Sequence, residues 1–156
     1  RYRGNGSALL VSDKAFLAAP PQGRAGRNVI LYGNADENAA WQILPSDCPF
    51  EARRGLVRVG ERRLERDDLA LVFTFPLESG PLESAAVICG SGPIGMRLTE
   101  PLPTFTSGTG FPDWLVFDVG VLETGPEAVL GTGFLGYDWS LDRGQTAWAA
   151  SVLEAK

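Results

Sequence analysis

The sequence predicts an α/β fold of three layers, in which helices cover a mostly parallel, Rossmann-like sheet and a polar β-hairpin is inserted. Several short runs are apolar throughout, which is typical of strands buried on both faces of a sheet. Segments that favour helix follow some of these runs, an alternation typical of βαβ units. A charged segment with turn residues at its centre separates the runs and predicts the hairpin.

The start of the chain predicts two strands separated by a loop. Residues 8–11 are apolar and predict a short strand, which residues 15–17 extend. Residues 19–27 are rich in proline and glycine and predict the loop. Residues 28–32 form a continuous apolar run and predict the first buried strand of the sheet.

A helix over residues 37–44 is expected to follow that strand. Asn34 or Asp36 is expected to cap its start, because short polar side chains accept hydrogen bonds from the free N–H groups of a first helical turn. Pro45 is expected to end it, because proline lacks the N–H that a continuing helix needs.

The middle of the chain predicts the hairpin and two more buried strands. Residues 56–59 and 62–64 predict the two arms of the hairpin, with residues 60–61 as its turn. Residues 69–75 and 85–89 are apolar again, and each predicts a strand of the main sheet.

The last third of the chain predicts fewer elements. A short helix is expected over residues 94–100, because Pro101 stops it. Residues 114–118 predict a strand, and residues 123–130 predict a helix with a weaker pattern. From residue 131 onward the chain is rich in glycine and aromatic residues, and it favours no particular element.

Composition predicts one globular domain over residues 1–156, with a hydrophobic fraction of 44% and a charged fraction of 21%. Within it we expect an N-terminal strand and loop over 1–27, a core over 28–141 and a tail over 142–156. No apolar run approaches the roughly 18 residues of a membrane-spanning helix, so no membrane span is expected. The net charge of −5 disfavours nucleic acid as a partner, because phosphates would be repelled.

Six of the twelve arginines lie between residues 53 and 66, with Glu51, Glu61 and Glu65 among or beside them. One interpretation is a patch that binds anions. The other is a solvent-exposed hairpin face whose arginines are balanced by the neighbouring glutamates. The second is favoured, because charges of both signs are interspersed.

The sequence contains no histidine, which excludes the common hydrolytic sites inside the chain. A Ser-His-Asp or Cys-His site needs an imidazole to take the proton of the nucleophile. Two cysteines without histidine cannot complete a four-ligand zinc site. We therefore expect no catalytic residue of this kind, no metal and no cofactor, and the spacing of the carboxylates selects no pair for glycoside chemistry. Cys89 predicts a buried free thiol, with a Cys48–Cys89 disulfide as the alternative.

Residues 90–95 match the Gly-x-Gly-x-x-Gly fingerprint of dinucleotide binding and follow an expected strand. Asp118 ends the next strand, where a ribose-binding acid would lie. However, Pro101 and Pro103 shorten the helix whose N-terminus should hold the pyrophosphate. A tight turn from strand to helix therefore explains these glycines better.

If the sheet is parallel, the strands over 28–32, 85–89 and 114–118 end at one edge. The residues that follow them would converge in the crevice where open α/β sheets bind ligands. The candidate ligand-binding residues are Gly33, Asn34, Asp36, Gly90, Ser91, Gly92 and Asp118. The alternative is that this edge is a set of short turns or is covered by a neighbouring domain.

The segment from Asn28 to Trp41 (NVILYGNADENAAW) resembles a segment in the C-terminal part of large secreted bacterial proteins of planctomycete type. Those proteins carry a prolyl-oligopeptidase-like α/β-hydrolase domain earlier in the chain. The similarity continues to about residue 141 through Asp67-Asp68-Leu69, Gly95-Met96-Arg97-Leu98-Thr99, Ser107-Gly108, Pro112-Asp113 and Asp138-Trp139-Ser140. Glu37 stands where the family pattern has threonine. The resemblance implies a secreted or periplasmic protein whose nucleophile and histidine lie upstream, and it assigns no functional residue here.

The leading hypothesis is a non-catalytic accessory C-terminal domain of a secreted serine hydrolase of peptidase or esterase type. Its partner would be the upstream hydrolase domain or another protein chain. One alternative is a small-ligand or nucleotide-binding module that uses the turn over residues 90–95. Another is a subunit that oligomerises through the aromatic surface around Trp139 and Trp148.

Overall fold

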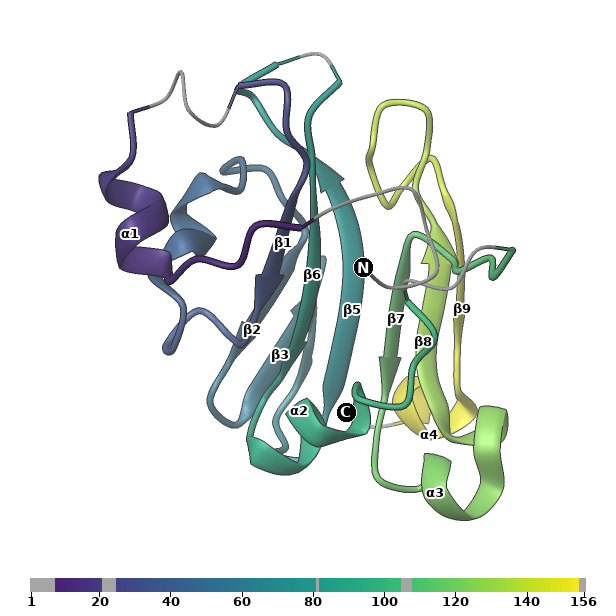
Figure 1. Ribbon diagram of the computed structural model, residues 1–156. Coiled ribbons are helices and arrows are strands. Elements are labelled where there is room, and N and C mark those ends of the chain that lie inside the picture. The colour runs from purple at the N-terminus through teal and green to yellow at the C-terminus, as the bar shows by residue number, and fades with distance from the viewer. Residues whose placement is uncertain (1–7, 21–24, 81, 105–107, 155–156) are drawn as a thin grey trace.

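The computed structural model describes residues 8–20, 25–80, 82–104 and 108–154, which form two β-sheets that pack face to face (Figure 1). The larger sheet has six strands in the order β1-β6-β5-β7-β8-β9, and the smaller has three in the order β2-β3-β4. The strands are β1 Val29–Tyr32, β2 Phe50–Arg53, β3 Leu56–Val59, β4 Arg62–Leu64, β5 Ala70–Pro76, β6 Ser84–Gly90, β7 Trp114–Phe117, β8 Val129–Phe134 and β9 Gln145–Trp148. The helices are α1 Asp13–Ala18, α2 Pro93–Leu98, α3 Val121–Thr124 and α4 Ala150–Glu154, with the 3-10 helices η2 Ala39–Ile43 and η3 Gly125–Ala128.

The expected three-layer, mostly parallel α/β fold is wrong. Among the described strands, β1 and β6 form the one parallel pair of the large sheet, and every other pair in it is antiparallel. The connections explain part of this, because residues 77–83 join β5 to β6 and are too few for the crossover that parallel neighbours need. The apolar strands are buried on one face by a second sheet rather than by a layer of helices.

The apolar runs that predict strands are confirmed as β1, β5, β6 and β7, each within one residue at either end. The predicted hairpin is confirmed as β3 and β4. Gly60 begins its turn with a φ of 58°, which suits glycine in a two-residue hairpin. Strand β2, which the sequence did not predict, pairs with β3 and completes the small sheet.

The main core lies between the two sheets. Leu71, Phe73 and Phe75 of β5 belong to it, and Phe50 of β2 stacks on Phe73 with ring centroids 4.6 Å apart. Trp114 of β7 is fully buried in the same cluster. Each large apolar side chain buried in this way stabilises the fold by roughly 1.5–3 kcal/mol. Packing of the two sheets therefore holds in place the strands whose ends carry the candidate site.

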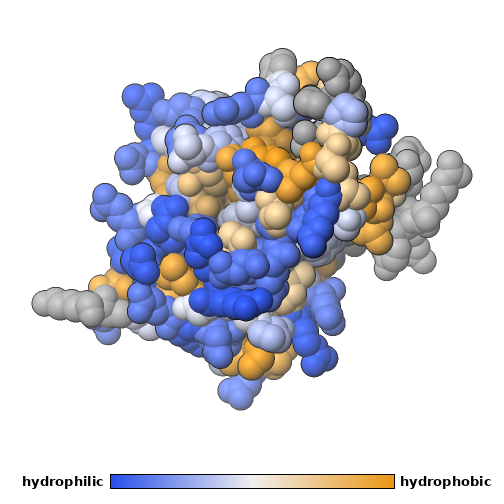
Figure 2. Space-filling view, turned by 90° about the vertical axis from the view of Figure 1, so that its left-hand side faces the viewer, coloured by the Kyte–Doolittle hydropathy of each residue, from blue (hydrophilic) through white to orange (hydrophobic). Residues whose placement is uncertain are grey.

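The opposite face of the large sheet is partly open. At one end, Leu98 of α2 packs with Ala70 and Phe117 in a second, smaller cluster. Further along, Ile30 and Tyr32 alternate with a buried residue in β1 and are 38% and 47% exposed. Figure 2 shows the side of the molecule that carries α1 and β1, where hydrophobic side chains lie among hydrophilic ones. The apolar strands are therefore not fully covered by the described residues.

The N-terminal part differs from the expectations. Residues 8–11 form no strand, and α1 begins directly after Ser12, whose hydroxyl oxygen accepts a hydrogen bond from the helix. The helix expected over 37–44 is the shorter η2, and its start is capped by Asn38 instead of the residues expected. Residues 21–24 of the expected loop, and Ser107, lie outside the described residues.

The C-terminal part holds more strand than expected. The short helix expected over 94–100 is confirmed as α2, but the helix expected over 123–130 is α3 and η3 followed by the start of β8. Strands β8 and β9 and helix α4 fill the segment to which no element was assigned. In the described part of the chain, no helix is long and apolar enough to cross a membrane.

Candidate functional site

The residues that follow β1, β6 and β7 lie at one end of the large sheet, although the sheet is mixed. Strand β7 is antiparallel to β5, and β5 is antiparallel to β6, so β1, β6 and β7 run in the same direction. At their ends, Asn34 Nδ2 donates a hydrogen bond of 3.0 Å to the backbone oxygen of Gly90. Gly33 N donates to the oxygen of Ile88 at 3.1 Å. The candidate residues after β1 and β6 are thus brought together by the fold.

The glycines within residues 90–95 make room for the backbone of this protein. A Cβ atom on Gly92 would collide with the carbonyl oxygen of Asp67, and one on Gly95 with the carbonyl oxygen of Leu69. A Cβ atom on Gly90 would collide with the backbone of α2. In a dinucleotide fold such glycines let the chain approach a pyrophosphate. Here the close approach is to the segment that leads into β5.

Ser91 is a structural residue with a buried hydroxyl group. Its Oγ accepts a hydrogen bond of 3.1 Å from Leu69 N, and its backbone N donates to the oxygen of Leu69 at 2.9 Å. Its backbone oxygen accepts from Gly55 N at 2.8 Å, which ties the β2–β3 turn to this end of the sheet. The hydroxyl group is therefore not presented to a substrate.

Asp118 is held by Arg66, which sequence reasoning did not single out as a site residue. Arg66 Nη1 lies 2.8 Å from Asp118 Oδ2, and Nε and Nη2 donate to the two oxygens of Asp68 at 2.9 and 2.6 Å. Asp118 Oδ1 accepts from Gly120 N at 2.8 Å. The hydrogen bonds to Asp68, followed by the one to Asp118, raise the pKa of Arg66 above its ordinary value. Both oxygens of Asp118 are thus used within the domain.

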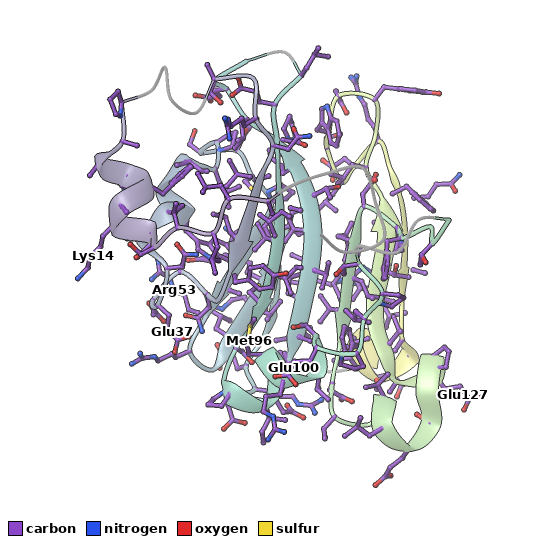
Figure 3. The ribbon with its side chains drawn as sticks, viewed as in Figure 1. Lys14, Glu37, Arg53, Met96, Glu100 and Glu127 are labelled. Atoms are coloured by element: carbon purple, nitrogen blue, oxygen red, sulfur yellow. The ribbon has the colours of Figure 1, made fainter. Side chains whose placement is uncertain are left out.

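Asp36 belongs to a second ion-pair network at the same end of the sheet. Its carboxylate accepts from Arg54 N at 2.9 Å and pairs with Arg53 Nη1 at 2.8 Å. Arg53 Nε in turn donates to Glu51 at 2.7 Å. The hydrogen bond from Arg54 N, with a further contribution from Arg53, holds the pKa of Asp36 below its ordinary value. Figure 3 labels Arg53 at this end of the molecule, together with Glu37, which pairs with the neighbouring Arg54 at 3.6 Å.

The arginines between residues 53 and 66 are mostly paired. Five of the six form ion pairs with carboxylates in the described part of the chain. This confirms the interpretation as a solvent-exposed face balanced by its own acids. Arg62 differs, because its guanidinium carbon lies 5.1 Å from the ring centroid of Trp148 and it has no ion-pair partner among the described residues.

Neither cysteine is poised as a nucleophile. Both thiols are free and buried, which confirms the expectation for Cys89 and does not support the alternative disulfide. Burial raises the pKa of the Cys48 thiol to about 11, and it raises that of Cys89 still further. A protonated, buried thiol is inert at neutral pH. Over the described ranges, no group of three or more acidic or cysteine side chains could hold a metal ion.

A groove of about 1040 Å³ lies at the opposite end of the sheet. It runs between the β3–β4 turn, the end of β5 and the loop from β8 to β9. Trp139 and Trp148, the two residues considered above for oligomerisation, line it. The groove was missed because its lining residues come from segments far apart in the sequence, so no local spacing indicates it.

Comparison of the chain with protein-family models, with curated proteins and with solved structures gives no match.

Proposed function

We propose that this chain is a non-catalytic accessory C-terminal domain of a secreted serine hydrolase and binds its partner through the open face of the large sheet. The observation that carries the proposal is that Asn34, Ser91 and Asp118 are all hydrogen-bonded within the domain. A catalytic residue has to reach a substrate, and these three side chains are already engaged. The chain also lacks the histidine that serine hydrolysis commonly uses.

The open face supplies the surface for a partner. Ile30 and Tyr32 of β1 expose apolar surface on it, and so does Phe134 of β8, which is 56% exposed. Apolar patches on soluble proteins commonly mark protein interaction sites, and aromatic residues are enriched at their centres. The partner that we propose is the upstream hydrolase domain of the same protein.

The resemblance of residues 28–141 to segments of planctomycete-type secreted proteins supports the hydrolase as the partner. It also supports a secreted or periplasmic location. The internal hydrogen bonds of Asn34, Ser91 and Asp118 agree with this, because they occupy the side chains that could otherwise act on a substrate here.

The proposal is tested by measuring binding of the isolated chain to the hydrolase domain encoded upstream of it, by sedimentation or calorimetry. The double variant Ile30→Asp/Tyr32→Asp should weaken binding at least about 10-fold, because it places charge in an apolar interface. The control Leu122→Asp/Leu153→Asp changes two exposed hydrophobic residues in α3 and α4 and should leave binding unchanged. Equal affinities for both double variants, or the absence of a hydrolase in that reading frame, would overturn the proposal.

A further inference from the structure

We infer that the groove between the β3–β4 turn, the end of β5 and the β8–β9 loop binds an arginine- or lysine-bearing segment of a partner protein. The inference does not rest on the proposed function, because none of Ile30, Tyr32 and Phe134 lines this groove.

The groove is lined by the indole rings of Trp139 and Trp148, by five carboxylates and by Arg62. One carboxylate, that of Asp138, pairs with Arg143 at 3.2 Å. The other four are those of Asp47, Glu61, Glu78 and Asp142.

The four carboxylates other than that of Asp138 outnumber Arg62, the cationic residue that lines the groove from β4. All are exposed, and none forms an ion pair or a side-chain hydrogen bond with another described residue. At the other end of the sheet, Asp36, Asp68 and Asp118 are each paired with an arginine. Unpaired like charges gathered in a concave surface attract a cationic partner and orient its approach.

The indole rings add sites that favour cations. Arg62 already places its guanidinium group over Trp148, with its central carbon 5.1 Å from the ring centroid. Trp139 is 41% exposed and meets Phe75 edge to face, with ring centroids 6.3 Å apart. The exposed part of Trp139 is free to receive a second guanidinium or ammonium group, because aromatic faces attract cations.

The backbone fixes Trp139 in place. Its φ of 63° is the one positive value among the described residues other than glycine, and a bulky residue rarely adopts it. Backbone hydrogen bonds hold the loop in this shape, from Trp139 N to the oxygen of Gly136 at 2.8 Å and from Gly136 N to the oxygen of Ser140 at 2.9 Å. Strained residues held in this way are concentrated at ligand-binding sites.

The size and charge of the groove favour a peptide segment over a neutral sugar. A volume of about 1040 Å³ reaches the upper end of small-ligand sites. A neutral glycan could stack on Trp139 but would leave the four carboxylates without counter-charges. Basic side chains would satisfy the carboxylates and the indole rings together.

The test uses fluorescein-labelled hexa-arginine as the probe and fluorescence anisotropy as the measurement. In the groove variant, Asp47→Asn, Glu61→Gln, Glu78→Gln and Asp142→Asn are combined. In the matched control, Glu100→Gln, Glu123→Gln, Glu127→Gln and Glu154→Gln remove the same charge from exposed positions outside the groove. The groove variant should bind the probe at least about 10-fold more weakly than the control does. The reason is that it loses four ion pairs between groove carboxylates and probe guanidinium groups, each of the strength usual for a surface pair. If both variants bound hexa-arginine equally weakly, net charge alone would explain the binding, and the inference would be overturned.

A second pair of variants tests the role of the indole ring. Trp139→Asn removes the ring and keeps a residue that tolerates positive φ, so the loop should retain its fold. It should weaken binding of hexa-arginine severalfold, whereas Tyr137→Ala, in the same loop but not lining this groove, should leave it unchanged. Unchanged binding by Trp139→Asn, or binding of neutral oligosaccharides in preference to hexa-arginine, would contradict a basic peptide as the occupant.

Discussion

Asn34 Nδ2 donates a hydrogen bond of 3.0 Å to the backbone oxygen of Gly90 and so joins the ends of the two parallel strands β1 and β6. The residue is 1% exposed, and its Oδ1 accepts from Asp36 N at 3.1 Å. Both functional groups of this amide are therefore used inside the domain. The edge that would bind a ligand in an open α/β sheet is here a joint that holds the fold together.

Replacing Asn34 with alanine should destabilise the domain by about 1–3 kcal/mol, because the Gly90 carbonyl and the Asp36 N–H both lose their partner. The free energy of unfolding in urea measures the effect. Glu127→Gln, a change at an exposed carboxylate, serves as the control and should alter this free energy by less than about 0.5 kcal/mol. If the Asn34→Ala variant were as stable as the control, the two hydrogen bonds of Asn34 would contribute nothing to the stability of the domain.

Gly95→Ala should destabilise the domain by about 3 kcal/mol, because the new methyl group would overlap the carbonyl oxygen of Leu69 and force the backbone to move. Gly110→Ala is the matched control, since no heavy atom lies within 4 Å of the position of its Cβ. Thermal unfolding of the two variants compares them directly. Similar melting temperatures would mean that residues 90–95 are not held by close backbone packing.

The sequence contains enough information to locate most strands of the large sheet but not to orient them. Residues 28–32, 69–75, 85–89 and 114–118 are recognisable because a continuous apolar run predicts a buried strand, whatever covers it. The same pattern arises under a layer of helices and under a second sheet. The short link between β5 and β6 is the local signal that favours an antiparallel pair.

Strand β8 was missed for a physical reason that lies in its glycines. A Cβ atom on Gly131 would collide with the ring of Trp148, and one on Gly133 with the backbone of β9 and with Trp114. The chain needs glycine there to bring two indole rings against the sheet, yet glycine weakens the local preference for strand. Glycine is needed there for contacts with residues distant in the sequence, and its presence removes the local strand preference by which β8 could have been predicted.

The sequence predicted that the candidate residues would lie at one end of the sheet. It did not predict that their side chains would form hydrogen bonds and ion pairs within the domain. Gly33, Asn34 and Gly90 meet because their strands run in one direction. The β2–β3 turn and the segment before β5 then fill this end of the sheet, with Arg53 on Asp36. Those contacts link residues far apart in the chain, and no spacing in the sequence indicates them.

Acid should weaken the domain partly through Asp36. Its pKa in the folded state lies below the ordinary value of 3.8, so its carboxylate stabilises the fold above that pH. This contribution is lost as the pH falls through the lower folded-state pKa. Asp36→Asn should therefore reduce the difference in unfolding free energy between about pH 6 and about pH 2.5, measured in urea. An unchanged difference would show that the hydrogen bond from Arg54 N does not favour the charged form.

Both thiols should be unreactive in the native protein. Burial raises the pKa of Cys48 to about 11, and Cys89 is fully buried, so little thiolate exists at about pH 8 and reagents have no access. Titration with an aromatic disulfide reagent should detect no fast-reacting thiol in the native chain and both thiols in urea. Rapid reaction of Cys48 in the native state would contradict its buried position.

The most direct measurement of the central claim is the hydrolytic activity of the purified chain on nitrophenyl esters and aminoacyl nitroanilides. If Asn34, Ser91 and Asp118 only stabilise the fold, the chain should hydrolyse these substrates no faster than buffer without protein. A Ser91→Ala variant should give the same rate. Turnover that remains with the chain through purification and is lost in Ser91→Ala would show that this end of the sheet is an active site and would contradict the account.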